Sequence, residues 1–247
     1  MSYTIAIAGK GGTGKTTIAA LLISQLAKEK KGKILGIDAD PNSNLAESLG
    51  LKIKEDIGSI VDSIAKNPQQ IPAGMSKDAF IDFRLQTNIL ESNGFDLLTM
   101  GRPEGPGCYC YVNNLLRGLI KKLSDSYDYV VIDNEAGFEH LSRRTMRKAD
   151  ALLVVSDTSQ AAIRAAERIK NLIIELDIQA KKKFLVLNRF TKGFDLDKAK
   201  KAGLEIAGTL SEDKEILNLN QQGRSVSLLD ENTASLQEIK KIISKIL

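Results

Sequence analysis

A glycine- and lysine-rich segment near the start of the chain has the residue types and spacing needed to bind phosphate. It reads Gly9-Lys10-Gly11-Gly12-Thr13-Gly14-Lys15-Thr16-Thr17. This run fits the pattern G-x-x-x-x-G-K-[ST], in which the glycines let backbone N–H groups surround phosphate oxygens. The N-terminus of the helix that follows adds partial positive charge. We therefore expect Lys15 to hold the β- and γ-phosphates of a nucleotide and Thr16 to ligate Mg²⁺.

Three aspartates lie where predicted strands end. Asp38 and Asp40 follow one apolar run, and Asp133 follows the run Val130–Ile132. Open α/β sheets bind ligands at the carboxyl ends of their strands, so we expect these carboxylates to face the phosphates. Asp133 is placed to hold the Mg²⁺ shell. An aspartate after a strand is also a common helix N-cap, which is the alternative role for each of the three.

Both cysteines of the chain lie together, as Cys108 and Cys110, after a Gly- and Pro-rich loop. Apolar residues at helical spacing follow, so the pair is expected at a helix N-terminus, where the dipole favours the thiolate. Thiolates bind Zn²⁺, Ni²⁺, Cu(I) or an iron–sulfur cluster. Two thiolates are too few for a closed site, but a symmetric dimer brings four together. The alternative, a pair of small core residues, fits poorly with an exposed loop.

The elements that must position these residues alternate between strands and helices. Apolar runs predict strands at Tyr3–Ala8, Lys33–Ile37, Tyr129–Ile132, Ala151–Val155 and Phe184–Leu187. Helical spacing predicts helices at Thr16–Glu29, Ala161–Leu176 and Thr233–Ile246. Residues 51–100 predict a helix near Ile57–Ala65 and two strands, Thr87–Leu90 and Phe95–Met100. Continuous apolar strands are buried on both faces, which predicts an α/β fold: a doubly wound, mostly parallel sheet with helices on both faces. We expect one domain over residues 1–247.

Composition is that of an ordinary soluble globular chain. The 247 residues are 43% hydrophobic and 27% charged, which excludes disorder as the main state. The formal charge of +4 is too small to argue for a nucleic acid or membrane partner. Two cysteines and one histidine exclude a disulfide scaffold and a His-rich metal enzyme. No run of apolar residues is long enough to cross a membrane and no signal peptide is evident, so a cytoplasmic protein is expected.

The segment Lys-Gly-Gly-Thr-Gly-Lys-Thr-Thr resembles the deviant phosphate loop, or Walker A motif, of the MinD/ParA/nitrogenase-iron-protein class of P-loop ATPases. The resemblance implies that Lys10 reaches across a dimer interface to the partner's nucleotide, so that the working unit is an ATP-bridged homodimer. It also implies that Asp40 orients the attacking water and that Asp38 lies in the segment called switch I.

Two further positions are compared with the same class. After Asp133 the MinD-like pattern is D-T-P-A-G, whereas this chain has D-N-E-A-G and so departs at residues 134 and 135. Gly137 is placed to offer a backbone N–H to the γ-phosphate as part of switch II. Asn188 matches the position that reads the purine, with a strand cap as the alternative. Asn188 is followed by Arg189 rather than by an N-K-x-D guanine motif, which favours ATP over GTP.

The cysteine pair, together with the stretches 38–41 and 135–144, resembles the nickel-insertion accessory ATPases of carbon monoxide dehydrogenase and acetyl-CoA synthase, the CooC type. The resemblance implies ATP-dependent delivery of nickel to the apo form of either enzyme as client. Ni²⁺, or Zn²⁺ in the same site, would bind to Cys108 and Cys110. His140, the one histidine, is not expected to be a metal ligand.

Two rival classes stay open. An iron–sulfur carrier would also bridge a dimer with four cysteines, but the nitrogenase iron protein has its cysteines far apart in sequence. A MinD/ParA-like ATPase would organise a membrane or DNA partner, the former through an amphipathic C-terminal helix. The last predicted helix does carry an apolar stripe, which more often packs on the core of its own chain. The basic clusters are short, so we expect neither nucleic acid nor membrane as partner.

Overall fold

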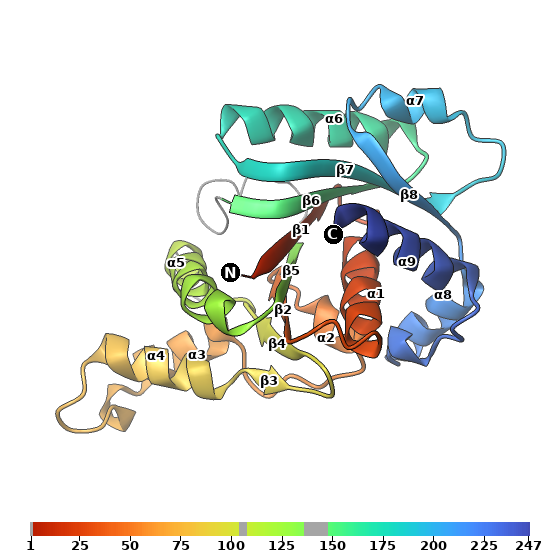
Figure 1. Ribbon diagram of the computed structural model, residues 1–247. Helices are drawn as coiled ribbons and strands as arrows, with labels where there is room; N and C mark the ends of the chain where they lie inside the picture. Colours follow the sequence, from red (N-terminus) through yellow and green to blue (C-terminus); the bar gives the residue numbers. More distant parts are fainter. Residues whose placement is uncertain (1, 104–107, 136–147) are drawn as a thin grey trace.

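The computed structural model describes residues 2–103, 108–135 and 148–247, and describes residues 108–110 by their backbone alone. A sheet of eight strands runs through them in the order β3-β4-β2-β5-β1-β6-β7-β8 (Figure 1). The strands are β1 Tyr3–Gly9, β2 Ile34–Ala39, β3 Leu90–Glu91, β4 Asp96–Thr99, β5 Tyr129–Asn134, β6 Lys148–Ser156, β7 Gln179–Phe190 and β8 Glu205–Ser211. Neighbouring strands are parallel except for the edge pair β3–β4. The predicted mostly parallel sheet is therefore confirmed.

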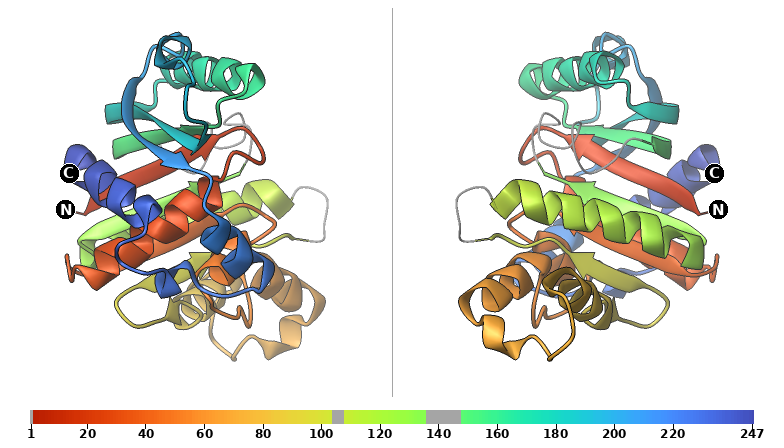
Figure 2. Two further views of the ribbon diagram at one scale, coloured as in Figure 1. Left: turned by 90° about the vertical axis from the view of Figure 1, so that its right-hand side faces the viewer. Right: turned by 90° about the vertical axis from the view of Figure 1, so that its left-hand side faces the viewer.

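Helices cover both faces of the sheet, as Figures 1 and 2 show. One face carries α1 Lys15–Lys28, α2 Asn44–Ser48, α8 Lys214–Gln221 and α9 Ala234–Ile246. The other carries α3 Ile57–Lys66, α4 Lys77–Thr87, α5 Cys108–Leu123, α6 Gln160–Glu175 and α7 Leu196–Lys200. Strand β1 lies between the two cores: Ile5 and Ile7 point to the first, and Ala6 and Ala8 point to the second. This burial on both faces explains why β1 reads as a continuous apolar run.

The apolar stripe of α9 is buried in the fold. It is formed by Leu236, Ile239, Ile242, Ile243 and Ile246, and it packs against β8 and α1. The apolar stripe therefore packs in the core and is not exposed to bind a membrane surface. The MinD-like alternative had used this helix as its membrane-binding element. Among the residues that the structure describes, no helix combines the length and apolar character needed to span a bilayer.

The structure corrects the prediction for part of residues 51–100. The expected strand Thr87–Leu90 is wrong, since Thr87 is the last residue of α4 and only Leu90 belongs to β3. Ser76 caps the N-terminus of α4, and the Asn88 side chain donates to the Arg84 carbonyl at 2.9 Å at its C-terminus. These local caps set the two ends of α4 and place Thr87 in the helix rather than in a strand. The predicted helix near Ile57–Ala65 is confirmed as α3, and the strand at Phe95–Met100 as β4.

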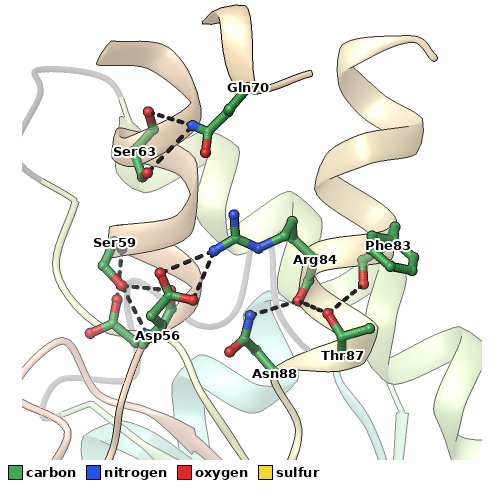
Figure 3. A network of polar contacts seen from close by, with 9 residues as sticks. Asp56, Ser59, Ser63, Gln70, Phe83, Arg84, Thr87 and Asn88 are labelled. Carbon is green, nitrogen blue, oxygen red and sulfur yellow. Dashed lines mark hydrogen bonds and ion pairs between the residues drawn. The ribbon is translucent and has the colours of Figure 1, made fainter. Parts of the chain in front are cut away.

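A polar network joins the two helices that project from the sheet edge, α3 and α4 (Figure 3). The Asp56 carboxylate accepts from the Ser59 backbone N–H at 2.7 Å, and the Ser59 hydroxyl accepts from the Asp56 N–H at 2.9 Å. This capping box fixes the start of α3. Arg84 of α4 donates to both carboxylate oxygens of Glu55, at 2.8 and 3.0 Å. The capping box and the Arg84–Glu55 ion pair together hold the N-terminus of α3 in place.

Candidate functional site

The phosphate-binding segment forms the loop between β1 and α1, at the carboxyl end of a central strand. Gly9 has φ +156°, and a Cβ there would lie 2.3 Å from the Val155 carbonyl oxygen. Gly14 has φ +92°, and a Cβ there would lie 2.1 Å from the Asn188 amide nitrogen. Close packing and backbone conformation both require glycine at these two positions. Strand, glycine loop and helix are thus in the arrangement that the sequence predicted.

Three side chains of this loop have distinct positions. The Thr13 hydroxyl donates to the Lys10 carbonyl at 2.8 Å and closes the loop on itself. Lys15 is turned inward: the residue is 7% exposed, and its ammonium lies 3.4 Å from the same carbonyl. Burial lowers the pKa of Lys15, while the nearby carboxylates of Asp133 and Asp40 oppose that shift. The Lys10 side chain is exposed. One lysine therefore faces the loop interior and the other faces outward.

Two buried carboxylates stand side by side below this loop. Asp38 of β2 and Asp133 of β5 occupy the same register position on adjacent parallel strands and are 0% and 1% exposed. Burial raises the pKa of Asp38 to about 7, and the neighbouring Asp133 adds to the rise. Burial likewise raises the pKa of Asp133 to about 6, although the Thr16 hydroxyl and the Lys15 ammonium oppose it. Two such groups favour a bound cation or proton between them and the loop.

The donor set around Asp133 fits Mg²⁺. Neither carboxylate oxygen of Asp133 has a hydrogen-bond partner of ordinary geometry within residues 2–103, 108–135 and 148–247. Buried polar atoms are rarely left unpaired, and carboxylate and hydroxyl oxygens are the ligands that Mg²⁺ prefers. Thr16, half-buried at the start of α1, supplies the hydroxyl. Asp133 and Thr16 are thus the residues that would hold the ion.

Asp38 has a different set of contacts. Its carboxylate accepts from the Leu45 N–H at 2.9 Å and from the Asp40 N–H at 3.1 Å. The Asp40 carboxylate in turn accepts from the backbone and side-chain nitrogens of Asn42, both at 2.9 Å. Asp38 therefore holds the turn that carries Asp40, and Asp40, half-buried, lies at the edge of the site. These contacts favour a structural role for Asp38, in stabilising the turn, over a role as a direct ligand.

A pocket of about 190 Å³ opens beside the loop, between the ends of β7 and β8 and the start of α8. It is lined by Thr17, Leu21, Asn188, Arg189, Leu210–Asp213, Ile216, Leu217 and Asn220. The Asn188 amide donates to the Thr13 carbonyl at 2.9 Å, and the Arg189 guanidinium donates to the Gly12 carbonyl at 3.0 Å. Two residues that line the pocket therefore also bind the phosphate loop. Arg189 was not a predicted site residue, because nothing in the sequence signals that its side chain turns back to this loop.

The comparison with known proteins decides the family. The sequence profile of a family described as an AAA domain matches residues 2–186, three quarters of the chain. The chain belongs to this AAA-domain family. An uncharacterized ATP-binding protein of Methanocaldococcus jannaschii is 42% identical over 98% of both chains. The carbon monoxide dehydrogenase accessory protein CooC of Rhodospirillum rubrum is 30% identical over 90% of this chain and 88% of its own.

The fold of this AAA-domain ATPase is that of MinD. The septum site-determining protein MinD of Pyrococcus horikoshii, solved with Mg-ADP, superposes with a TM-score of 0.75 at 20% identity and covers 100% of this chain and 96% of its own. The family and the fold together make the chain an ATPase, so the predicted hydrolysis of ATP is confirmed at this level.

The chain that follows β4 contacts this nucleotide site at Met100. The Met100 N–H, just after β4, donates to the Asp38 carbonyl at 2.8 Å, and the Met100 carbonyl accepts from the Gly58 N–H at 2.9 Å. The helix begins at Cys108, as the sequence predicted. The side chains of Cys108 and Cys110, and Gly137 with the stretch 136–147, lie outside the described residues. Among the side chains that are described, no three His, Cys, Asp or Glu residues form a metal-binding group.

Residues 100–103 pack closely against the N-terminus of α3. Gly101 has φ +66°, and a Cβ there would lie 1.9 Å from the Asp56 carboxyl carbon. At Gly58 a Cβ would lie 2.9 Å from the Pro103 nitrogen. Residues 100–103 therefore run directly across the N-terminus of α3. Because Met100 is hydrogen-bonded to Asp38, a shift of the Asp38 backbone must either move residues 100–103 or be resisted by their packing against α3.

The raised pKa of Asp133 predicts a pH-dependent stability. An aspartate that ionises near 3.8 when unfolded and near 6 when folded contributes stability that is full below pH 3.8 and is lost as pH rises through 6. Asp133→Asn removes that loss, so the variant should be more stable than wild type by up to about 3 kcal/mol at pH 8 without nucleotide or Mg²⁺. Urea unfolding at pH 5, 6.5 and 8 measures the difference, which should grow between pH 5 and 6.5 and then level off, because Asp133 is ionised in both states above its folded pKa of about 6. A difference that is constant over this range would contradict a pKa of Asp133 that burial raises.

Proposed function

We propose that this ATPase is a metallochaperone that carries Ni²⁺ between the cysteine pairs of two subunits and delivers it to apo carbon monoxide dehydrogenase or acetyl-CoA synthase. The observation that carries the proposal is the position of Cys108 and Cys110 at the start of α5, a few residues after Met100, whose N–H donates to the Asp38 carbonyl of the nucleotide site. The similarity to CooC, named as an accessory protein of carbon monoxide dehydrogenase, supports the choice of client. A helix N-terminus favours the thiolates that bind such a metal.

ATP would lie on the phosphate loop, with its base in the 190 Å³ pocket. The backbone N–H groups of Gly11, Gly12 and Gly14 surround the phosphates, and the buried Lys15 ammonium neutralises their charge. Mg²⁺ held by Thr16 and Asp133 supplies further charge neutralisation at the γ-phosphate when bound. Asp40, held in its turn by Asp38, orients the attacking water.

Two subunits would meet face to face around the nucleotides. The exposed Lys10 of each subunit then contributes charge to the partner's triphosphate, so ATP binding and dimer formation reinforce each other. The meeting brings two cysteine pairs together, which supplies four thiolates for one metal ion. Hydrolysis removes the γ-phosphate that both subunits hold, loosens the dimer and releases the metal. Such transfer requires the two nucleotide states to differ in metal affinity.

The contact between Gly101 and Asp56 allows a test of the proposed coupling between nucleotide state and Ni²⁺ affinity. Gly101→Ala places a methyl group against the Asp56 carboxyl and should separate residues 100–103 from α3. We expect ATP hydrolysis within about threefold of wild type, while the Ni²⁺ affinity no longer changes between ATP and ADP. Gly74→Ala is the matched control, since Gly74 also has a positive φ, +84°, but faces open space. Nucleotide-dependent Ni²⁺ affinity that survives Gly101→Ala would exclude this contact as the link.

The proposed function itself is tested by anaerobic metal binding. Purified wild type and the double variant Cys108→Ser/Cys110→Ser are loaded with Ni²⁺ in the presence of Mg-ATP, and bound metal is counted per dimer. We expect about one Ni²⁺ per dimer in wild type and none in the variant, whose ATP hydrolysis stays measurable. Equal metal content in both proteins would reject the metallochaperone and leave an ATPase with a protein, membrane or DNA partner.

A further inference from the structure

Strand β7 carries an irregularity where it passes the phosphate loop. Leu187 pairs with Thr209 and Phe190 pairs with Ser211, so Asn188 and Arg189 together face the single residue Leu210. This is a β-bulge, one extra residue in one strand of a pair. Arg189 has φ +50°, in the left-handed region that a residue with a side chain avoids. A strained residue of this kind persists only where the surrounding structure holds it.

The bulge directs two neighbouring side chains to the same loop. In a regular strand successive side chains point to opposite faces. Here the Asn188 amide donates to the Thr13 carbonyl at 2.9 Å, and the Arg189 guanidinium donates to the Gly12 carbonyl at 3.0 Å. Two consecutive residues of β7 thus bind two consecutive carbonyls of the phosphate loop.

The peptide group between Gly12 and Thr13 has one hydrogen bond within the loop, a long one: the Thr13 N–H donates to the Lys10 carbonyl at 3.4 Å. Gly12 has φ +81°, it is exposed, and a Cβ built there would meet no atom within 4 Å. No neighbouring atom therefore packs against Gly12 on its side-chain side, and the 3.0 Å bond from Arg189 is the shorter of the two hydrogen bonds to this peptide group. A loop binds phosphate through N–H groups that point inward, which requires its carbonyls to point elsewhere. The Arg189 guanidinium holds the Gly12 carbonyl in such an outward orientation.

We propose that Arg189 is a positioning residue for ATP hydrolysis, which keeps the phosphate loop in its binding conformation through the Gly12 carbonyl. Arg189 should affect the affinity for the triphosphate group, because the loop that it holds binds the triphosphate and not the base. It acts before the chemical step, so it sets affinity rather than turnover. The inference depends on ATP hydrolysis alone and not on the proposed role in nickel delivery.

Three variants and one control test this role. Arg189→Gly removes the guanidinium and relieves the strained backbone, Arg189→Ala removes the guanidinium alone, and Arg189→Lys keeps one charged donor. Lys192→Ala, three residues further on and exposed, removes the same charge from the same region. Dissociation constants are measured for Mg-ATP and for inorganic tripolyphosphate with Mg²⁺, together with kcat, KM and the melting temperature.

We expect both ligands to bind about tenfold more weakly to the Gly and Ala variants, with kcat within about threefold of wild type. Arg189→Gly should melt at a higher temperature than Arg189→Ala, which separates loss of function from loss of fold. Arg189→Lys should recover part of the affinity, and Lys192→Ala should match wild type. Unchanged affinities in the Gly and Ala variants would overturn the proposal. So would a loss confined to ATP, which would assign the guanidinium to the base, or a fall in kcat alone.

Discussion

Lys15→Ala should reduce kcat/KM for ATP by at least about a hundredfold, the largest loss we expect from any single substitution. Lys15 is 7% exposed and its ammonium is directed into the loop beside Asp133, so no other described cation can take its place at the phosphates. Because the buried ammonium has a lowered pKa, its removal costs little folding free energy, and the variant should melt close to wild type.

Lys28→Ala is the matched control, since Lys28 is exposed at the opposite end of the same helix. Phosphate release and a thermal melt on both variants give the measurement. If Lys15→Ala hydrolysed ATP within threefold of Lys28→Ala, the assignment of the nucleotide site to this loop would fail.

The second large effect is expected from Lys10→Ala. The variant should still bind ATP, because Lys15 and the loop N–H groups remain, but it should stay monomeric with ATP and lose about a hundredfold in hydrolysis. The physical reason is position: the Lys10 side chain is exposed, whereas its carbonyl closes the loop by accepting from Thr13 and Lys15. In the proposed dimer, this exposed side chain would be available to the partner's triphosphate.

Light scattering with a non-hydrolysable ATP analogue, beside turnover assays, separates the two parts of this prediction. Lys10→Arg keeps the charge and should retain part of the dimerisation. ATP-dependent dimers and normal turnover in Lys10→Ala would show that the proposed action across the interface is wrong.

Local sequence pattern was sufficient for the centre of the fold. The run Tyr3–Gly9, the glycine loop and helix α1 are specified by short-range features: continuous burial, positive φ at Gly14 and a helix start at Lys15. The sequence pattern did not predict a strand whose residues are only partly buried. Strand β8, Glu205–Ser211, was not predicted because only two of its seven residues are buried.

The site was predictable where residues act within their own segment and not where they act across the chain. Lys15 and Asp133 follow from motif and strand-end position. Arg189 depends on a bulge that is defined by pairing with β8, and a one-residue shift in pairing leaves no trace in composition. The contact between Gly101 and Asp56 is likewise set by how β4 meets α3, which spacing along the sequence does not encode.

The central claim is that nucleotide state controls metal binding at the cysteine pair, and the most direct test is the Ni²⁺ affinity in two nucleotide states. Anaerobic calorimetry would measure the dissociation constant of wild type with Mg²⁺ plus a non-hydrolysable ATP analogue and again with Mg-ADP, with Cys108→Ser/Cys110→Ser as the blank. We predict tighter binding by at least about tenfold in the ATP-like state, since the nucleotide can drive delivery only by as much as the metal affinities of the two states differ. Equal dissociation constants in the two states would contradict the account, whatever the stoichiometry of the bound metal.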